Sequence, residues 1–400
     1  MKTRQLYSSL LEHIPKKEYT VLIGARQTGK STLLKQLQET LIANGETVVL
    51  LNLERKDILL ELNQGPENVL KYFNKKERRK NYLLIDEIQY LDDPAHFLKL
   101  MFDEHARDLK IIATGSSSFY IDRQFKDSLA GRKKIFELPT LDFEEFLLFK
   151  NQDGLLNELQ SIRWGEKQKS VSESQLWVAL DEYITYGGYP AVVLEDRAKD
   201  KIERLQEIRD SFVKRDILEA GIQDETKFYR LMILLAGQTG SLVNTNELAN
   251  TLRLGNPATD QYIYTLQKCF HVSLVRPFFS NLRKELVKMP KLYFNDLGLR
   301  NVLVNYFAPF EQRADKGFLL ENFVYRRLSE KYAKDHIKFW RTADGNEVDF
   351  IVEENTKEGK AIEVKFNSQE VNIKKYKKFS EMYPKFPLQF YSWRGSELFL

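Results

Sequence analysis

The sequence predicts an α/β fold divided among several domains, and three observations lead to that expectation. Apolar, β-rich runs alternate with helical patterns through the first third of the chain, beginning at 19–23. Helix-period apolar positions dominate the middle, and a helix followed by three strand-like runs occupies the last hundred residues. The 400 residues exceed what one hydrophobic core usually serves, so we expect two to four domains.

Composition narrows the class of protein. Hydrophobic residues make up 42% and charged residues 30%, a globular balance. No apolar run is long enough to cross a bilayer and the N-terminus lacks a signal-peptide pattern, so we expect a cytoplasmic protein without membrane contact. The single cysteine, Cys269, excludes an intrachain disulfide and is expected in a core. A net charge of +4 does not by itself indicate a nucleic-acid partner.

The segment that follows 19–23 fits a strand, a glycine-rich loop and a helix. It spells GARQTGKST, a complete GxxxxGK[ST] pattern, and a helical LLKQLQETLIANG comes next. Glycines let successive N–H groups turn toward a phosphate, Lys30 neutralises the β- and γ-phosphates, and Ser31 ligates magnesium. The sequence therefore predicts a P-loop for ATP with Mg²⁺. Its residues are Gly24, Ala25, Arg26, Gln27, Thr28, Gly29, Lys30, Ser31 and Thr32, the last as a helix or α-phosphate contact.

Three more strands are expected at 47–55, 81–91 and 109–117. The middle one carries the buried run YLLI and then Asp86-Glu87. At the carboxyl end of such a strand Asp86 can hold magnesium through water, and Glu87 can polarise the attacking water. The last strand ends in small hydroxyl residues near the expected γ-phosphate. The candidate sensor residues there are Thr114 and Ser116.

The strand that ends in Asp86-Glu87 resembles the Walker B element of AAA-type ATPases. In that family an arginine before the fifth strand commonly reaches the nucleotide of a neighbouring subunit. Here Arg132 precedes the strand-like KIFELP. The resemblance therefore implies that Arg132 is an arginine finger and that a second copy of the chain is a partner. The alternative is a solvated basic cluster of Arg132 with Lys133 and Lys134.

The middle of the chain predicts a helical lid and then a winged helix. The lid covers 142–222 and contains YGGYP, which is typical of a tight turn. In 223–303 three helices precede a hairpin with a basic tip, an order similar to a winged helix. Because the third helix is not basic, DNA contact and protein contact both remain open. The residues available for phosphate are Arg276, Arg283, Lys284 and Lys288.

Four ionisable side chains stand out in the C-terminal region. Glu321 lies on the expected helix and Asp349 on a strand, while Glu363 and Lys365, two apart on the next strand, share a face. Carboxylates in such an array bind Mg²⁺ through oxygen. The metal lowers the pKa of a water that attacks phosphate, and a lysine stabilises the developing charge. The alternative is a plain alternation of charged and apolar residues on half-exposed strands.

This region looks like the PD-(D/E)xK nuclease superfamily, with Asp349, Glu363 and Lys365 at its D…ExK positions. Glu321 fills the upstream acid, and Val348 replaces the proline of the family name. From GARQTGKST and LLIDEIQ to EVDFIV and AIEVK, the chain resembles a prokaryotic family of AAA-type ATPases with a C-terminal domain of unknown function. The residues expected to ligate metal in the two sites are Ser31, Asp86, Glu321, Asp349 and Glu363.

The expected domains are a P-loop AAA-type ATPase at 1–141, a helical lid at 142–222, a winged helix at 223–303 and a restriction-endonuclease-like α/β domain at 304–400. The leading hypothesis is an ATP-hydrolysing AAA-type ATPase that gates a magnesium-dependent nuclease-like domain acting on nucleic acid, with DNA first. One alternative is an ATP-dependent switch or scaffold whose nuclease-like domain does not cleave. The other is a nucleotide-responsive DNA-binding regulator.

Overall fold

The fold is mixed α/β, as predicted, with a parallel sheet in the N-terminal part and a mixed sheet in the C-terminal part. The computed structural model describes residues 2–73, 80–115, 129–163, 171–279, 285, 288–355 and 358–399. The chain divides into two compact units, the first up to Thr140 with 268–270 and the second from Leu141 onward. The division into four domains stays a prediction.

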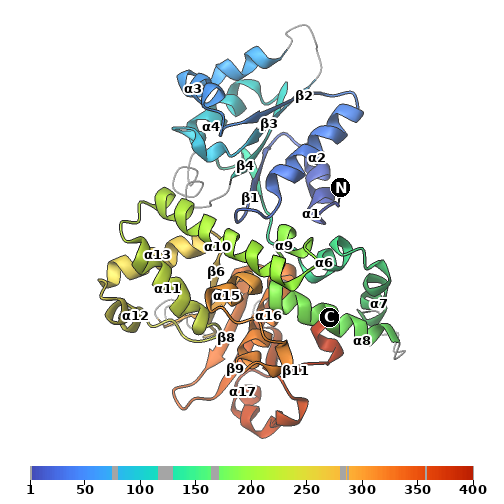
Figure 1. The fold of residues 1–400 in the computed structure, drawn as a ribbon, viewed down its shortest axis with the longest axis vertical. Helices are drawn as coiled ribbons and strands as arrows, with labels where there is room; N and C mark the ends of the chain where they lie inside the picture. Colours follow the sequence, from blue (N-terminus) through green and yellow to red (C-terminus); the bar gives the residue numbers. More distant parts are fainter. Residues whose placement is uncertain are drawn as a thin grey trace. The chain divides into compact units, whose positions relative to one another are not determined.

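A five-stranded sheet forms the centre of the first unit, in the order β2-β3-β4-β1-β5, and all its pairs are parallel (Figure 1). The carboxyl ends of its strands therefore lie at one edge. Two strands end earlier than predicted, because the chain turns into a short 3₁₀ helix, η2 (Ile88–Tyr90), after Asp86 and into a turn after Asn52. The strands are β1 (Tyr19–Ile23), β2 (Thr47–Asn52), β3 (Asn81–Asp86), β4 (Leu109–Gly115) and β5 (Lys133–Glu137).

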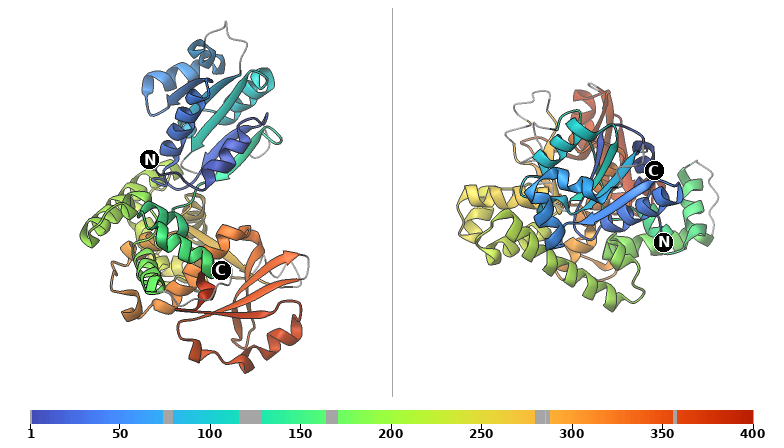
Figure 2. Two further views of the ribbon diagram at one scale, coloured as in Figure 1. Left: turned by 90° about the vertical axis from the view of Figure 1, so that its right-hand side faces the viewer. Right: turned by 90° about the horizontal axis from the view of Figure 1, so that it is seen from above.

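Helices cover both faces of this sheet, as Figures 1 and 2 show. Alternate strand residues point to opposite faces, so Leu22 and Leu84 pack in one core while Val21 and Ile85 pack in the other. Burial on both faces explains why these strands are continuous apolar runs. The first core is closed by α1 (Leu6–His13) and α2 (Lys30–Ala43), and the second by α3 (Lys56–Gln64), η1 (Pro66–Tyr72) and α4 (Pro94–His105).

The second unit begins with helices. The first of them starts at a capping box in which the Asp142 carboxylate accepts from the Glu145 backbone N–H and Glu145 returns the bond. The helices are α6 (Phe143–Phe149), α7 (Asp153–Arg163), α8 (Val171–Tyr186), α9 (Pro190–Val193), α10 (Ala198–Ala220), α11 (Glu225–Gly237), α12 (Thr245–Leu252), α13 (Asn256–Lys268), α15 (Leu297–Leu303), α16 (Lys316–Lys331) and α17 (Lys377–Met382).

The YGGYP segment makes the tight turn that its glycines predict. Gly187 has φ +77°, and a Cβ there would lie 2.2 Å from a carboxylate oxygen of Asp296. Asp296 accepts from the Gly188 N–H at 2.8 Å and caps α15 by accepting from the Leu299 N–H at 3.0 Å. The turn is therefore fixed against the start of α15 and leaves no room for side chains.

The C-terminal sheet has six strands in the order β11-β10-β9-β8-β6-β7 (Figure 1). The β6–β7 hairpin, expected as the wing, lies in this sheet because β6 pairs in parallel with β8. One face packs on α16 and the other on α17. The strands are β6 (Val272–Pro277), β7 (Lys291–Phe294), β8 (Ile337–Arg341), β9 (Glu347–Asn355), β10 (Glu358–Lys365) and β11 (Leu388–Ser392), with 3₁₀ turns η3 (Phe310–Gln312), η4 (Lys334–His336), η5 (Ser368–Glu370), η6 (Ile373–Tyr376) and η7 (Ser396–Phe399).

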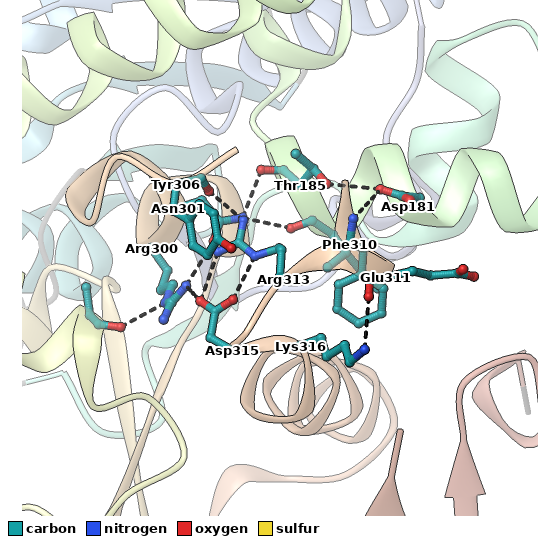
Figure 3. A network of polar contacts seen from close by, with 12 residues as sticks. Asp181, Thr185, Arg300, Asn301, Tyr306, Phe310, Glu311, Arg313, Asp315 and Lys316 are labelled. Atoms are coloured by element: carbon teal, nitrogen blue, oxygen red, sulfur yellow. Dashed lines mark hydrogen bonds and ion pairs between the residues drawn. The ribbon is translucent and has the colours of Figure 1, made fainter. Parts of the chain in front are cut away.

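A buried polar network joins three of the helices in this unit (Figure 3). The Asp315 carboxylate, just before α16, accepts from Arg313 Nε at 2.8 Å and Nη2 at 2.9 Å, and it also pairs with Arg300 of α15. Asn301 of α15 donates to the Thr185 carbonyl of α8 at 2.9 Å. Both guanidinium groups are buried, and the Asp315 carboxylate, which pairs with each of them, offsets their charge.

Candidate nucleotide site and C-terminal carboxylate centre

The P-loop joins the end of β1 to α2 through an unusual backbone path. Gly24 has φ +155° and Gly29 has φ +96°, and Gln27 also lies in the left-handed region at +58°. A Cβ on Gly24 would stand 2.2 Å from the carbonyl oxygen of Leu138. Gly24 is therefore required both by its conformation and by the chain that passes beside it.

Lys30 is the first residue of α2, and its side chain is buried within the loop. Its Nζ donates to the Gly24 carbonyl at 3.0 Å and to the Ala25 carbonyl at 2.7 Å. The Thr28 hydroxyl donates to the same Ala25 carbonyl at 3.0 Å. The ammonium group thus lies where the loop curves around it.

Asp86 is the point at which three elements meet. Its Oδ1 accepts from Ser31 Oγ of α2 at 3.0 Å and from Thr114 Oγ1 of β4 at 2.6 Å. The Thr114 hydroxyl also accepts from the Glu87 N–H at 3.0 Å. Ser31, Asp86, Glu87 and Thr114, which the sequence nominated separately, therefore lie together at the carboxyl edge of the sheet, whereas Ser116 lies outside the described residues.

Glu87 leaves the strand in the left-handed conformation, with φ 60° and ψ 53°. A non-glycine residue there carries about 1–2 kcal/mol of strain, which persists only where surrounding contacts hold it. One such contact is the side chain of Gln89, which donates to Glu87 Oε2. Gln89 is not among the residues predicted from the sequence, although it lies only two residues after Glu87 in the sequence.

Arg4 supports the P-loop from a distance, and sequence reasoning missed it too. The buried guanidinium donates from Nη1 to the Thr28 carbonyl at 2.8 Å and from Nη2 to the Pro139 carbonyl at 2.9 Å. These contacts span 24 and 135 positions of the chain, so no local pattern signals them. The loop is thereby tied to the segment after β5.

Arg132, the arginine-finger candidate, bonds within its own unit. Its Nε donates to Asp103 Oδ1 of α4 at 2.7 Å and its Nη2 to Oδ2 at 3.2 Å. Arg132 precedes the five-residue strand β5, so it lies at the amino edge of the sheet, about 16 Å from the edge that carries the P-loop. From that edge its side chain cannot reach the phosphates of a nucleotide bound in the P-loop of the same chain.

The C-terminal candidates lie on adjacent strands. Phe350 of β9 pairs with Ile362 of β10, so Asp349 and Glu363 are the next residues along the two strands. Glu363 Oε1 accepts from Tyr376 Oη at 2.6 Å and from Lys365 Nζ. Its buried Oε2 has no hydrogen-bond partner among the residues that the structure describes. Asp349 Oδ2 accepts from the Val364 N–H at 2.8 Å.

Lys291, which sequence reasoning missed, reaches the acidic side chains from β7. Its buried Nζ lies 2.9 Å from Glu321 Oε1 and 3.7 Å from Asp349 Oδ1, and it also pairs with Glu347. Tyr293 Oη donates to the same Glu321 oxygen at 2.6 Å. A lysine beginning an otherwise apolar strand, and Glu347 two residues before Asp349, were the available signals.

Burial and charge shift the pKa values of these groups. Burial raises the pKa of Glu321 to about 7, and Asp349 adds to that rise while Lys291 opposes it. Burial also raises the pKa of Glu363, again with Asp349 adding to the shift. For Lys291, burial favours the neutral amine, but Glu321, Asp349 and Glu347 outweigh it and raise the pKa. The carboxylates therefore crowd one another around a lysine that stays charged.

These residues do not fit a divalent ion in the arrangement observed. Within the described ranges, no three His, Cys, Asp or Glu side chains are grouped so that they could hold a metal. Glu321, Asp349 and Glu363, predicted as magnesium ligands, are not gathered about one point. The physical reason is that Lys291 stands among the oxygens of Glu321, Glu347 and Asp349.

Two other expectations concern surfaces. Arg276 and Lys288 are exposed, and Arg283 and Lys284 lie outside the described residues, so the basic tip stays a prediction. Across the part of the chain that the structure covers, no helix is both long and apolar enough to span a bilayer.

Comparison with known families agrees with the geometry of the first unit. Residues 16–147 match the family model described as AAA domain. Two further stretches, 178–309 and 316–394, match a domain of unknown function (DUF8612) and a domain of unknown function (DUF4143). The family match and the P-loop together support an AAA-type P-loop fold for the N-terminal unit. Neither domain of unknown function confirms a nuclease.

Two curated relatives extend over most of the chain. An uncharacterized protein of Methanocaldococcus jannaschii is 27% identical over 375 residues, which are 90% of this chain and 78% of that protein. An uncharacterized protein of Haemophilus influenzae is 28% identical over 344 residues, 83% of this chain and 78% of that protein. Among solved structures, the Aeropyrum pernix ORC1 protein in complex with DNA is 14% identical, covering 75% of this chain and 91% of that one. Its TM-score of 0.32 supports no inference about function.

Proposed function

We propose that the chain binds ATP with Mg²⁺ in its first unit and hydrolyses it. The observation that carries this proposal is the meeting of Ser31 and Thr114 on Asp86, at 3.0 Å and 2.6 Å, beside a P-loop. A hydroxyl and a carboxylate in that relation are the groups that hold magnesium against the β- and γ-phosphates of a nucleotide. The match to an AAA domain supports the same conclusion.

Each side chain of the site has a distinct part in this proposal. The N–H groups of 24–29 and Lys30 receive the phosphates, and Ser31 with Asp86 holds the magnesium, Asp86 through water. Bound magnesium neutralises charge on the phosphates. Glu87 polarises the attacking water, and Thr114 positions it near the γ-phosphate. Thr114 also holds the Glu87 N–H, so one hydroxyl couples the two acidic residues.

Removal of Lys30 tests the binding site directly. Lys30→Ala should abolish high-affinity ATP binding measured by calorimetry with magnesium, because it removes the side chain aimed at the β- and γ-phosphates. Lys35→Ala, on the exposed side of the same helix, is the matched control and should bind ATP like the unmodified chain. Equal affinity in the Lys30 and Lys35 variants would refute the site.

For the second unit, we propose a nuclease-like domain that acts on nucleic acid, with DNA as the first candidate, under the control of the ATPase. The observation that favours it is the placement of Asp349 and Glu363 at successive positions of β9 and β10, with Lys365 bonded to Glu363. The position of Lys291 favours the alternative of a switch or scaffold that binds without cleaving. A DNA-binding regulator is the third candidate, and the exposure of Arg276 is its support.

A cleavage screen separates the nuclease from the two candidates that do not cleave. The full chain would be incubated with single- and double-stranded DNA and RNA, with magnesium or manganese, and with or without ATP. A nuclease should produce nicks that disappear with chelator and in Lys365→Ala. Binding without any cleavage beyond the Lys365→Ala background would favour the scaffold or the regulator, and it would leave the ATPase proposal unaffected.

A further inference from the structure

Strand β7 brings two donors to a group of three acids, of which Asp349 is buried and Glu321 and Glu347 are partly buried. Lys291 and Tyr293 alternate with Leu292, so their side chains lie on one side of the strand, where Tyr293 joins one core, while Leu292 packs in another core on the opposite side. Both donate to Glu321 Oε1, at 2.9 Å and 2.6 Å. The strand thus supplies a positive charge and a hydroxyl to α16, which bears Glu321.

The ammonium group of Lys291 is shared among acids from two elements. Besides Glu321, it pairs with Glu347 and lies 3.7 Å from Asp349, both on β9. The Lys291 side chain is only 3% exposed, and the three acids are 12%, 22% and 11% exposed. Buried carboxylates that repel one another require a cation, and within the described part of the chain Lys291 is placed to provide it.

We propose that Lys291 is the resident cation of this centre, and that a divalent cation binds there only when Lys291 is removed or displaced. The oxygens that surround Nζ are carboxylate oxygens, the ligands that hard divalent cations take. Magnesium would need the same oxygens at about 2.1 Å, so the two cations exclude each other. The inference rests on the proposed nuclease-like domain only for the identity of the site, and it explains why the acids there do not fit a metal.

A tethered lysine has consequences that differ from those of a structural ion pair. Acids that pair with a lysine but cannot converge on one metal ion predict no gain of metal affinity when that lysine is removed. A resident cation predicts that a divalent ion replaces it, because the three carboxylates lose the cation that they share. Arginine at the same position keeps the charge and should keep the divalent ion out.

The test is manganese binding to the nucleotide-free full chain, followed by the electron paramagnetic resonance signal of free Mn²⁺. The variants are Lys291→Met, which removes the charge at similar volume, Lys291→Arg, and Lys291→Met combined with Asp349→Asn. We expect the unmodified chain and Lys291→Arg to show no Mn²⁺ site that depends on Asp349. Lys291→Met should gain such a site and bind Mn²⁺ at least tenfold more tightly than the unmodified chain. Adding Asp349→Asn to Lys291→Met should remove the gained site.

The unmodified chain keeps the inference falsifiable if Lys291→Met fails to fold. Asp349→Asn in the unmodified background should leave Mn²⁺ binding unchanged, whereas a loss of binding would overturn the proposal. Where Lys291→Met folds, absence of the gained site would also overturn it. Failure of the nuclease proposal is distinguishable: a Lys291→Met protein that binds Mn²⁺ through Asp349 and cleaves nothing supports the resident cation and argues against cleavage.

Discussion

The nucleotide site depends on single residues held in backbone conformations that few residue types adopt. Gly24 and Gly29 have positive φ in the P-loop, and Gln27 and Glu87 adopt left-handed conformations on either side of the site. These backbone angles set the directions of the loop N–H groups and of the Glu87 side chain at the carboxyl edge of the sheet. Such conformations cost free energy, and they persist where the surrounding structure holds them, most often at functional sites.

Gly24 offers a sharp test at this scale. Gly24→Ala should abolish ATP binding, because its Cβ would meet the Leu138 carbonyl at 2.2 Å in a backbone conformation that alanine rarely adopts. The measurement is nucleotide affinity by calorimetry together with the melting temperature. Gly45→Ala is the matched control, since Gly45 also has positive φ but a Cβ there meets nothing within 4 Å. Gly45→Ala should cost about 1 kcal/mol and leave ATP affinity intact. Normal affinity in Gly24→Ala would contradict the geometry.

The residues that the sequence predicts for the nucleotide site share one property, which is that a local pattern marks them. Those of the P-loop lie in one motif, and Asp86 and Glu87 follow a recognisable apolar run, so the local pattern is sufficient to predict them as candidates. Arg4 and Lys291 meet their partners only through the fold. Lys291 binds Glu321 across 30 positions, and Arg4 binds Pro139 across 135. A local sequence pattern does not indicate contacts of this kind.

At the scale of elements, alternation predicted the strands of the first sheet well, since burial on both faces makes apolar runs. Strand ends were less predictable. The β3 strand stops at Asp86 because Glu87 turns left-handed, a property of the backbone that the residue type does not indicate. The β6–β7 hairpin has the order of a wing, yet its pairing with β8 depends on residues about sixty positions further along the chain, which no local pattern indicates.

The Asp315 network predicts a large stability effect from one carboxylate. Asp315→Ala should lower the free energy of unfolding of the second unit by about 3–5 kcal/mol, because it leaves Arg300 and Arg313 buried without their counter-charge. Chemical denaturation followed by circular dichroism measures this. Asp200→Ala, which breaks an exposed pair with Arg197, should change little. Equal effects of the two substitutions would mean that burial does not govern the network.

The same carboxylate predicts a pH dependence. Burial alone would raise the pKa of Asp315, but hydrogen bonds from Arg313 and the charge of Arg300 outweigh it and lower the pKa. An acid whose pKa is lowered by folding stabilises the fold above its ordinary pKa and loses that contribution as the pH falls. The melting temperatures of the unmodified chain and Asp315→Asn should therefore differ at neutral pH and converge below about pH 4. A constant difference across this range would rule out ionisation as the cause.

At the scale of the whole molecule, the chain combines an AAA domain with a second compact unit that carries its own mixed sheet. Arg132 lies at the amino edge of the first sheet, away from the P-loop of its own chain. If it acts on nucleotide, a second copy must supply the site.

Assembly can therefore be tested through Arg132. Arg132→Ala should leave ATP affinity nearly unchanged and slow hydrolysis only at concentrations where copies associate. The measurement is turnover per subunit across a dilution series, with association followed by light scattering. Asp103→Ala, which removes the ion pair with Arg132, serves as the control for loss of that ion pair itself. ATP turnover per subunit that depends neither on protein concentration nor on Arg132 would contradict the arginine-finger role.

The central claim is that Asp86 and Glu87 form the hydrolytic edge of a magnesium–ATP site, and Glu87→Gln tests it most directly. Calorimetry and phosphate release would be measured on the same preparation, with Glu104→Gln on the exposed side of α4 as the control. The account predicts that Glu87→Gln binds ATP like the unmodified chain and that turnover falls by about 10²-fold or more, because the amide cannot polarise water. ATP turnover at the unmodified rate in Glu87→Gln would contradict the claim.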